Sequence, residues 1–257
     1  MTAVAPAADR NLPLLMVDGV TVAFDGFKAL NGFSMTLDRG TLRVLIGPNG
    51  AGKSTLCDVI IGRVRATSGH VYFKGEDITH LSEHQIVQRG ICRKFQTPGV
   101  LSSLTVLDNL LIAARSDRRW WRSLTTAPSA SESARADEVL EQIGLAERRT
   151  MLAGELAHGE KQWLEIGMVV ATDADLLLLD EPTAGMGPAE TSRTAELIHN
   201  LLGRHAVLVI DHDMSFVEQL GGRVTVLHQG EFLREGSVAQ IRQDPDVRAV
   251  YLGRSEH

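Results

Sequence analysis

Residues 44–62 read VLIGPNGAGKSTLCDVIIG, and this stretch decides the fold. An apolar segment at residues 42–46 leads into it, a loop with three glycines and one proline follows, and apolar side chains then recur at helical spacing. Gly47, Gly52, Lys53 and Ser54 occupy the fixed positions of the pattern G-x-x-x-x-G-K-[ST]. A strand, a glycine-rich loop and a helix in this order predict a phosphate-binding loop in an α/β domain.

Each residue type in this loop has a chemical reason. Glycines let the backbone turn tightly and bring its N–H groups, and the positive end of the next helix, close to anionic oxygens. Lys53 supplies a positive charge to the β- and γ-phosphates, Ser54 offers a hydroxyl to Mg²⁺, and Thr55 reaches the α-phosphate. The alternative is a glycine-rich turn that binds nothing. The expected nucleotide contacts are Gly47, Pro48, Asn49, Gly50, Ala51, Gly52, Lys53, Ser54 and Thr55.

Composition limits the remaining possibilities. The chain has 257 residues, of which 44% are hydrophobic, enough for one large domain with a full core. A net charge of −6 argues against nucleic-acid binding through a broad basic face. Two cysteines are too few for a disulfide framework and suit a reducing cytoplasm, and no apolar run is long enough to cross a bilayer. We expect residues 1–12 to form a flexible tail and residues 13–257 a single domain.

Segments on either side of the loop have strand and helix signals. Residues 14–24 and 30–37 have strand character, which suggests an antiparallel β-layer beside the nucleotide. Phe24 ends the first of these strands, and its ring could stack on an adenine or belong to the core. After the first helix, residues 66–75 fit a turn, a short strand and a second turn, and Ser82 caps a helix at residues 83–88.

Residues 91–96 return to extended chain before Thr97, Pro98 and Gly99 break it. Gln96 therefore lies at a strand end, where its amide could contact Mg²⁺ or the attacking water, or be exposed to solvent. From residue 98 to about 165 the chain has the character of an inserted helical subdomain. Within it, residues 118–122 read RRWWR, which could dock on a partner or a lipid surface, or simply cover the subdomain.

Acidic residues follow two apolar strands further along the chain. Residues 176–179 are all leucine and lead into Asp180 and Glu181. The apolar run at residues 206–210 leads into Asp211, His212 and Asp213. Buried parallel strands bind ligands at their C-terminal edge, so these side chains are expected to meet there. Asp180 is suited to hold Mg²⁺ through water, Glu181 to polarise a nucleophilic water, and His212 to donate to the γ-phosphate or to order the water.

GPNGAGKST, Gln96, the segment LAHGE before LEIG, LLLLDEP and His212 occur in this order, and together they resemble the ATP-binding subunits of ABC transporters. The resemblance covers nearly the whole chain. It implies the ABC ATPase version of the P-loop NTPase fold, with an antiparallel β-subdomain and an inserted helical subdomain. It also implies a Mg²⁺-dependent ATPase at the cytoplasmic face of the inner membrane, peripheral to it.

The same resemblance implies partners and roles. The ATPase would work as a head-to-tail pair, with a second copy or a paralogue, and each ATP would lie between the phosphate-binding loop of one subunit and the LAHGE segment of the other. Phe24 would stack on adenine, Gln96 would link the nucleotide to the transmembrane permease subunits, Glu181 would be the general base and His212 the switch histidine. A solute-binding protein outside the membrane would deliver the cargo.

Finer matches suggest the subfamily. RKFQTPGVLSSLTVLDNL, LAHGEKQWLEIGM, DEPTAGM, IDHDM and IRQDPDVRAVYLG resemble importers of branched-chain amino acids and, more closely, of urea or short amides. The stretches RKFQ and HGEKQWLEIGM favour urea, with branched-chain amino acids as the alternative. An ABC-type ATPase without a transporter and a P-loop kinase are further alternatives, but the first usually needs a second cassette or a basic face, and the second an arginine-bearing lid.

Three positions depart from the family pattern. Where Leu-Ser-Gly-Gly-Gln is usual, this chain has Leu156, Ala157, His158, Gly159 and Glu160. Ala157 has no hydroxyl for the facing γ-phosphate; we expect His158 and the Gly159 N–H to donate instead, and Glu160 to face away from phosphate. Gly187 replaces an aspartate that is usual in the loop after Glu181, which bears on communication between the two subunits.

Overall fold

The computed structural model describes residues 12–94, 99–114 and 128–252. Within these ranges the strands form two sheets. The antiparallel sheet has the order β2-β1-β4-β5, from β1 (Leu15–Phe24), β2 (Phe27–Leu37), β4 (Ser68–Phe73) and β5 (Glu76–Asp77). The larger sheet has the order β10-β9-β3-β8-β7-β6, from β3 (Leu42–Ile46), β6 (Ile91–Arg93), β7 (Leu176–Asp180), β8 (Ala206–Ile210), β9 (Arg223–His228) and β10 (Glu231–Ser237). Among the described residues of the larger sheet, β10 pairs with β9 in the antiparallel direction, and the other neighbouring strands pair in parallel.

The helices fall into groups along the chain. α1 (Lys53–Ile60) and α2 (Glu83–Gln88) precede the helical segment, which contains α3 (Val106–Ala114), α5 (Ala130–Gln142) and α6 (His158–Ala171), with short 3-10 turns at Ala146–Arg148 and Ala153–Glu155. The C-terminal part contains α7 (Pro188–Leu201), α8 (Met214–Leu220), α9 (Val238–Gln243) and α10 (Pro245–Leu252). The predicted antiparallel layer and the predicted helix at residues 83–88 are confirmed.

The strands β3, β7 and β8 of the larger sheet are buried on both faces, and their side chains alternate between two cores. Leu177 and Leu179 of β7 pack into the core that contains α6, α7 and α8, whereas Leu176 and Leu178 pack into the core that contains α1 and the antiparallel sheet. Strands covered on both faces read as continuous apolar runs, which is why β7 is almost entirely leucine. It follows that α1 and α6 lie on opposite faces of this sheet.

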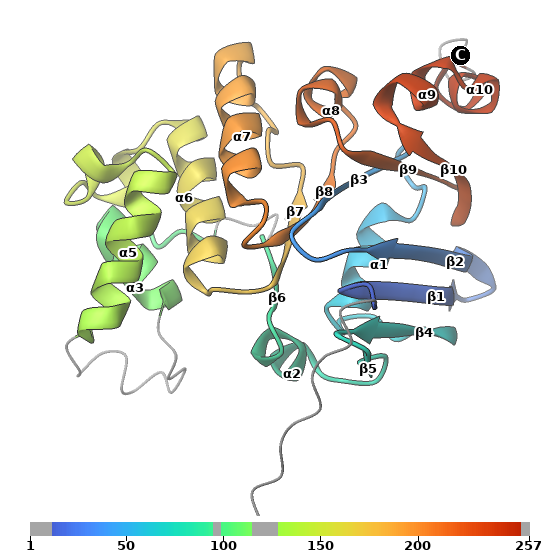
Figure 1. Cartoon of the computed structure of the whole chain (residues 1–257), viewed down its shortest axis with the longest axis horizontal. Coiled ribbons are helices and arrows are strands. Elements are labelled where there is room, and N and C mark those ends of the chain that lie inside the picture. Colours follow the sequence, from blue (N-terminus) through green and yellow to red (C-terminus); the bar gives the residue numbers. More distant parts are fainter. Residues whose placement is uncertain (1–11, 95–98, 115–127, 253–257) are drawn as a thin grey trace, which may run out of the picture.

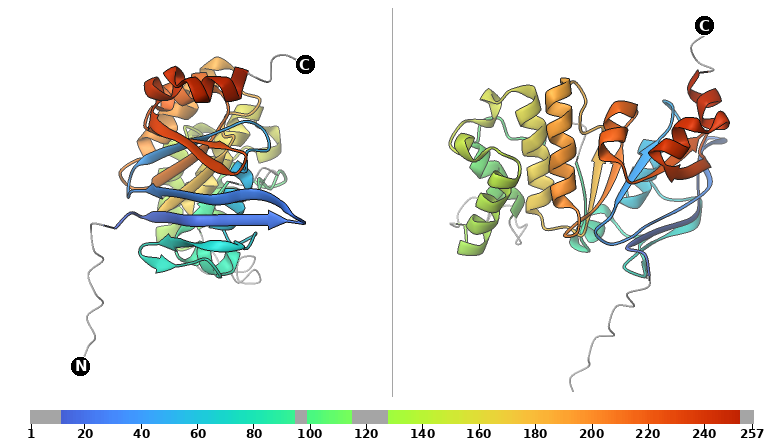
Figure 2. Two further views of the ribbon diagram at one scale, coloured as in Figure 1. Left: turned by 90° about the vertical axis from the view of Figure 1, so that its right-hand side faces the viewer. Right: turned by 45° about the horizontal axis from the view of Figure 1, so that its top comes forward.

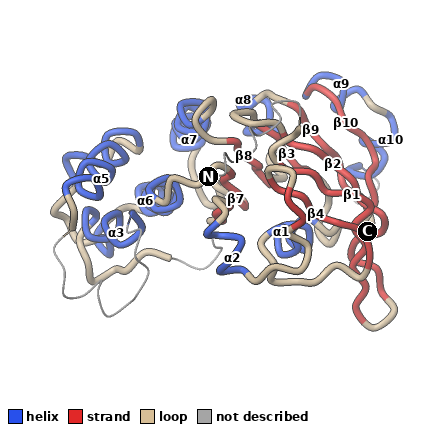
Figure 3. The backbone as a smooth tube through the Cα atoms, turned by 60° about the horizontal axis from the view of Figure 1, so that its bottom comes forward, coloured by secondary structure: helices blue, strands red, loops and turns tan. Residues whose placement is uncertain are grey.

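The elements are arranged from a helical end to a sheet end. Figure 1 shows α3, α5 and α6 together at one end of the molecule, with β1, β2, β4 and β5 at the other. The right view in Figure 2 keeps the helical end apart from the antiparallel sheet, and Figure 3 shows the strands of both sheets on the side away from α3 and α5. α3, α5 and α6 therefore form a helical layer that packs on the sheet chiefly through α6 and α7.

Three helices were not predicted from the sequence, although each has a start signal. Gly187 and Pro188 open α7, with Pro188 in its first turn, and Asp213 caps α8 by accepting from the Ser215 N–H at 2.8 Å. α10 begins at Pro245, in the first position after an aspartate. The missed signals are therefore local ones.

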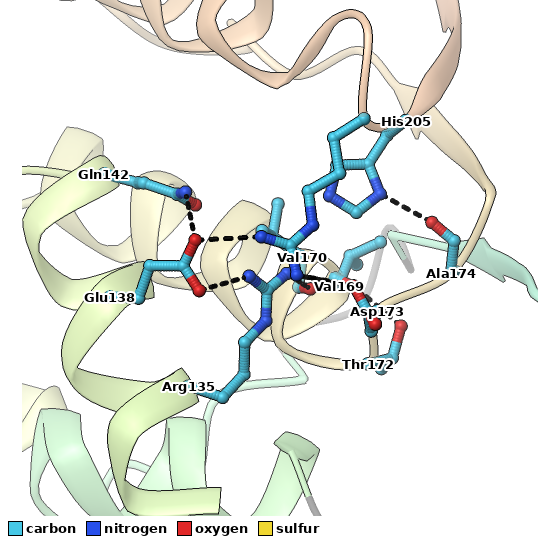
Figure 4. A network of polar contacts seen from close by, with 10 residues as sticks. Arg135, Glu138, Gln142, Val169, Val170, Thr172, Asp173, Ala174 and His205 are labelled. Atoms are coloured by element: carbon cyan, nitrogen blue, oxygen red, sulfur yellow. Dashed lines mark hydrogen bonds and ion pairs between the residues drawn. The ribbon is translucent and has the colours of Figure 1, made fainter. Parts of the chain in front are cut away.

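Ion pairs join the helical layer to the N-terminal edge of the larger sheet. Arg135 of α5 pairs with Glu138 at 2.8 Å, and Arg204, just before β8, pairs with Glu138 at 2.9 Å and with Asp173 at 3.1 Å. His205 Nδ1–H donates to the Ala174 carbonyl oxygen, 2.6 Å away. Figure 4 shows these groups from α5 facing the segment between α6 and β7. This N-terminal edge network fixes where the helical layer meets the sheet.

Candidate nucleotide site

Close backbone contacts require two glycines of the phosphate-binding loop. A Cβ atom on Gly47 would lie 2.2 Å from the carbonyl oxygen of Leu227 in β9, and one on Gly52 would lie 2.4 Å from that of Ala29 in β2. Gly52 also has a φ of 104°, in the region that favours glycine. The loop is therefore held between strands of both sheets, where a larger side chain at either position would displace it.

Lys53, the first residue of α1, folds back over this loop. Its Nζ donates to the carbonyl oxygens of Gly47 at 2.6 Å and Pro48 at 3.1 Å, and the residue is buried. Burial lowers the pKa of Lys53, and nearby carboxylates, Glu181 first among them, oppose that change. Lys53 thus lies within electrostatic reach of both the loop and the acidic edge of the sheet.

The start of α1 offers unpaired helical N–H groups. Gly52 provides no side-chain cap there, and Ser54 and Thr55 occupy the first turn, with Ser54 exposed. The first N–H groups of a helix need partners, and the helix dipole favours anionic ones. Phosphate oxygens therefore fit this turn, between its N–H groups and Lys53.

The two acids at the end of β7 differ in their surroundings. Only 2% of the Asp180 side chain is exposed, compared with 37% of the Glu181 side chain. Glu181 has a φ of 45°, which residues other than glycine rarely adopt, and its N–H donates to the Ile210 carbonyl at 2.8 Å. Because such strained conformations concentrate at functional sites, this one supports Glu181 as a site residue.

A buried carboxylate at the end of β8 holds His212 beside Glu181. Asp211 accepts from the N–H groups of His212 at 2.7 Å and Asp213 at 3.0 Å, and from the Thr183 hydroxyl at 3.2 Å. Burial raises the pKa of Asp211, and these hydrogen bonds oppose the rise. The His212 Nδ1 lies 3.3 Å from Glu181 Oε1. The structure therefore brings the predicted histidine and the predicted base together.

Oxygen donors near the loop fit a magnesium ion. In nucleotide sites, Mg²⁺ takes one or two ligands from the protein and completes its shell with phosphate oxygens and water. The buried carboxylate of Asp180 and the exposed hydroxyl of Ser54 belong to that donor class. The chemistry of these residues therefore fits the metal that the sequence predicts.

From the sequence, Arg93 had no role beyond its place in the RKFQ stretch, and the structure places it directly against Asp180. Its guanidinium donates to Asp180 Oδ2 at 2.7 Å and to Asp58 Oδ1 at 2.6 Å. Arg93 ends β6, a strand whose other residues are Ile91 and Cys92. A charged residue that continues an otherwise apolar strand is the only local signal of this role.

The LAHGE segment at residues 156–160, which includes the first residues of α6, makes its contacts within its own chain. The Glu160 carboxylate accepts from the Ala157 N–H at 3.0 Å, as expected of a side chain turned back onto the helix start. His158 Nε2 lies 2.9 Å from the carbonyl oxygen of Ala184, in the loop that follows Glu181. Gly159 packs against Glu190 of α7, whose carboxylate oxygen would be 2.2 Å from an added Cβ atom. The segment and the loop after β7 are therefore joined.

Two further predicted site residues, Phe24 and Gln96, lie away from the contacts described above or outside the described residues. Phe24 is 49% exposed at the turn between β1 and β2, so its ring is accessible and is not part of the core. Gln96 lies outside the described residues, and so does the RRWWR segment at residues 118–122. In the part of the chain that the structure describes, no helix combines the length and the apolar character needed to span a membrane.

Comparison with known proteins settles the family. A family model described as "ABC transporter" matches residues 30–184, which include the phosphate-binding loop, Asp180 and Glu181. The chain belongs to the ABC transporter ATP-binding family. It is therefore an ATPase and the nucleotide-binding subunit of an ABC transporter. A second model, described as "Branched-chain amino acid ATP-binding cassette transporter", matches residues 235–257 at the C-terminal end of this ABC chain.

Relatives cover almost the whole ABC chain. The high-affinity branched-chain amino acid transport ATP-binding protein BraF of Pseudomonas aeruginosa is 36% identical over 250 residues, which are 94% of this chain and 98% of BraF. The protein of the same description named LivG in Escherichia coli K12 is 37% identical with the same coverage. A crystal structure of an ATP-binding cassette of an ABC transporter in its ADP conformation matches with a TM-score of 0.85 at 32% identity, over 95% of this chain and 100% of that one. These matches confirm the predicted ABC ATPase fold.

Proposed function

We propose that this chain hydrolyses Mg²⁺-bound ATP to power a solute importer. One observation carries the proposal: His212 and Glu181 lie within 3.3 Å of each other, at the sheet edge whose carboxylates act on Lys53 of the phosphate-binding loop. A polyphosphate on that loop would place its terminal phosphate between a cation and a candidate base. ADP in a similar cassette structure supports a nucleotide as the ligand.

Each site residue has a proposed role. Glu181 takes a proton from the attacking water, His212 donates to the γ-phosphate, and Lys53 binds the β- and γ-phosphates. Ser54 and Asp180, with Gln96, would hold Mg²⁺, which supplies neutralising charge to the phosphate oxygens. The remaining contacts come from the backbone of residues 47–55 and from the exposed ring of Phe24, which stacks on the adenine.

The second half of each ATP site comes from a partner subunit in this proposal. α1 and α6 lie on opposite faces of the sheet, so the start of α6 can serve a nucleotide bound to another copy or to a paralogue. His158 Nε2–H donates to the Ala184 carbonyl oxygen, so Nδ1 can donate in trans only from the imidazolium form, in which both ring nitrogens carry a proton. The missing hydroxyl at Ala157 would cost about 1.5–3 kcal/mol if no donor replaced it.

We propose the domain organisation that the family resemblance implies. Residues 13–257 form one ABC ATPase domain, in which the segment from about 98 to 165 is the inserted helical subdomain. A groove of about 280 Å³, lined in part by Lys94, Gly99 and Met168, would receive a transmembrane permease subunit. The complex would lie at the cytoplasmic face of the inner membrane and take its solute from an external solute-binding protein.

The solute that we infer is a branched-chain amino acid. BraF and LivG are named for that transport, and the C-terminal model at residues 235–257 carries the same description. These findings favour the amino-acid alternative over urea or a short amide, which the RKFQ and HGEKQWLEIGM stretches suggest. An identity of 36–37% leaves the two solutes to be separated by experiment.

Uptake of labelled leucine and labelled urea tests this proposal in cells that carry either the unmodified chain or the Lys53→Ala variant. Selective loss of leucine uptake in the variant is the expected result, because the phosphate-binding loop loses its cation. Selective loss of urea uptake would retain the transport ATPase and overturn the solute. Equal uptake of both solutes in both strains would reject the importer function.

A further inference from the structure

Arg93 makes a buried, two-armed connection between α1 and β7. Its side chain is 6% exposed, that of Asp180 is 2% exposed and that of Asp58 is 29% exposed. One terminal nitrogen, Nη1, donates to Asp58 Oδ1 at 2.6 Å, and the other, Nη2, donates to Asp180 Oδ2 at 2.7 Å. The planar fork of a guanidinium fixes both carboxylates in direction as well as in distance.

The charges of this group favour a cation at Asp180. Arg93 brings one positive charge to two carboxylates, so an excess of negative charge stays at the end of β7. Without Arg93, Asp180 would be a buried carboxylate lacking its ion pair and free to rotate. The ion pair uses Oδ2, and Oδ1 is then the oxygen left for a metal or a metal-bound water.

We propose that Arg93 is a positioning residue for the metal site, holding Asp180 so that its second carboxylate oxygen binds the divalent cation of the nucleotide. The inference rests on the proposed role of Asp180 in holding Mg²⁺. It gives a role to Arg93, which enters the sequence analysis only as the first residue of the RKFQ stretch. Outer partners of metal ligands commonly change metal affinity by about 10- to 100-fold when they are removed.

Lys94 provides a matched control in the next position. It is as deeply buried as Arg93, with 4% of its side chain exposed, but it turns to α6, where its Nζ lies 3.4 Å from Glu165 Oε2 and donates to Gln162. Removal of either residue takes one buried cation from the end of β6. Only Arg93 donates to the Asp180 carboxylate, whereas Lys94 acts on Asp180 through its charge alone.

The experiment is a titration of the full-length protein and its ADP complex with Mn²⁺, followed by electron paramagnetic resonance, with ADP affinity also measured in chelator. For Arg93→Met we expect Mn²⁺ affinity about tenfold lower than in the unmodified protein, with metal-free ADP affinity unchanged. Lys94→Met should match the unmodified protein in both measurements. Arg93→Lys, which keeps the charge but loses the fork, should restore part of the Mn²⁺ affinity.

Asp180→Asn separates failure of this inference from failure of the metal assignment. If Asp180→Asn lowers Mn²⁺ affinity and Arg93→Met does not, the positioning role is overturned and the metal site stands. If Asp180→Asn has no effect on Mn²⁺ affinity, both the assignment of Asp180 and the inference are wrong. Equal losses of Mn²⁺ affinity in Arg93→Met and Lys94→Met, or an equal loss of metal-free ADP affinity, would indicate general disruption and overturn the role. Should Arg93→Met not fold, unchanged Mn²⁺ affinity in Arg93→Lys and in Asp58→Asn would overturn it too.

Discussion

The two edges of the parallel sheet use ion pairs in different ways. At the C-terminal edge, Arg93 and Lys94 are 6% and 4% exposed and bind partners on β7, α1 and α6. At the N-terminal edge, Arg204 is 49% exposed, and its partners Glu138 and Asp173 are 44% and 62% exposed. Both sets join the sheet to helices, but only the first buries both members of an ion pair, Arg93 with Asp180.

This difference distinguishes ion pairs that support the nucleotide site from ion pairs that only join the sheet to helices. An exposed pair is screened by water and salt and contributes about 0–1 kcal/mol. A buried pair contributes little net stability against an apolar replacement, yet losing one partner is costly because a buried charge is left alone. We infer that the buried charges at the C-terminal edge are present because the chemistry of the site needs carboxylates there.

The largest expected effect is that of Arg93→Met on stability. It leaves Asp180 buried without its ion pair, and we expect the free energy of unfolding to fall by about 3–5 kcal/mol. Chemical denaturation measures this change. The double variant Arg93→Met, Asp180→Asn removes the stranded charge and should recover a large part of the loss; a double variant no more stable than the single one would contradict the explanation.

Lys94→Met is expected to lower the free energy of unfolding by less, about 1–3 kcal/mol at neutral pH. Glu165, left without its ion pair, can become neutral by taking up a proton. Burial raises the pKa of Glu165, and Lys94 opposes that rise. Without Lys94 the folded pKa rises further, so the folded state gains stability relative to the unmodified protein as the pH falls toward that pKa. Denaturation curves over a range of pH should show the deficit shrinking in acid, and a constant deficit would count against this view.

A smaller, pH-dependent effect is expected at the N-terminal edge, from His205. Burial lowers its pKa, its hydrogen bond to Ala174 opposes the change, and the nearby charges are those of Arg135, Arg204 and Asp173. The unfolded chain then binds the proton more tightly, so stability is complete above about pH 6.5 and is lost as the pH falls toward the folded pKa. In His205→Gln, the free energy of unfolding should change less over this window. An identical pH profile in both proteins would remove His205 as the cause.

The smallest effect is expected for Arg204→Gln, which breaks two exposed pairs. We expect a loss of about 0–1 kcal/mol in free energy of unfolding at low salt and less at high salt. Melting temperatures at two salt concentrations measure it. A loss as large as that of Arg93→Met would show that exposure does not explain the contrast between the two edges.

The parts of the site that the sequence predicts are those whose spacing the ligand itself dictates. The phosphate-binding loop presents Gly47, Gly52 and Lys53 within a few residues of one another, and the acids follow an apolar strand directly. A polyphosphate requires that local arrangement, so the arrangement can be recognised in a single short stretch of sequence. The confirmed antiparallel layer and the strand leading to Asp180 could also be predicted from the local sequence, because strand-like and continuous apolar runs mark them.

Contacts between distant residues could not be predicted in this way. Arg93 is 35 positions from Asp58 and 87 positions from Asp180, and His158 is 26 positions from Ala184. Only the fold brings these pairs together, and nothing in the local sequence of β6 names its partners. α7 is a different case, because Pro188 at its start and Glu190 in its first turn are ordinary signals that the prediction passed over.

The most direct test of the account is nucleotide retention and oligomeric state of the Glu181→Gln variant with ATP and Mg²⁺, measured by size-exclusion chromatography with light scattering. Removing the proposed base should stop hydrolysis but not binding, so the variant is expected to elute as a dimer that retains ATP, whereas the unmodified protein turns ATP over and returns to monomer. Turnover by the variant at the rate of the unmodified protein would contradict the account and place the base elsewhere.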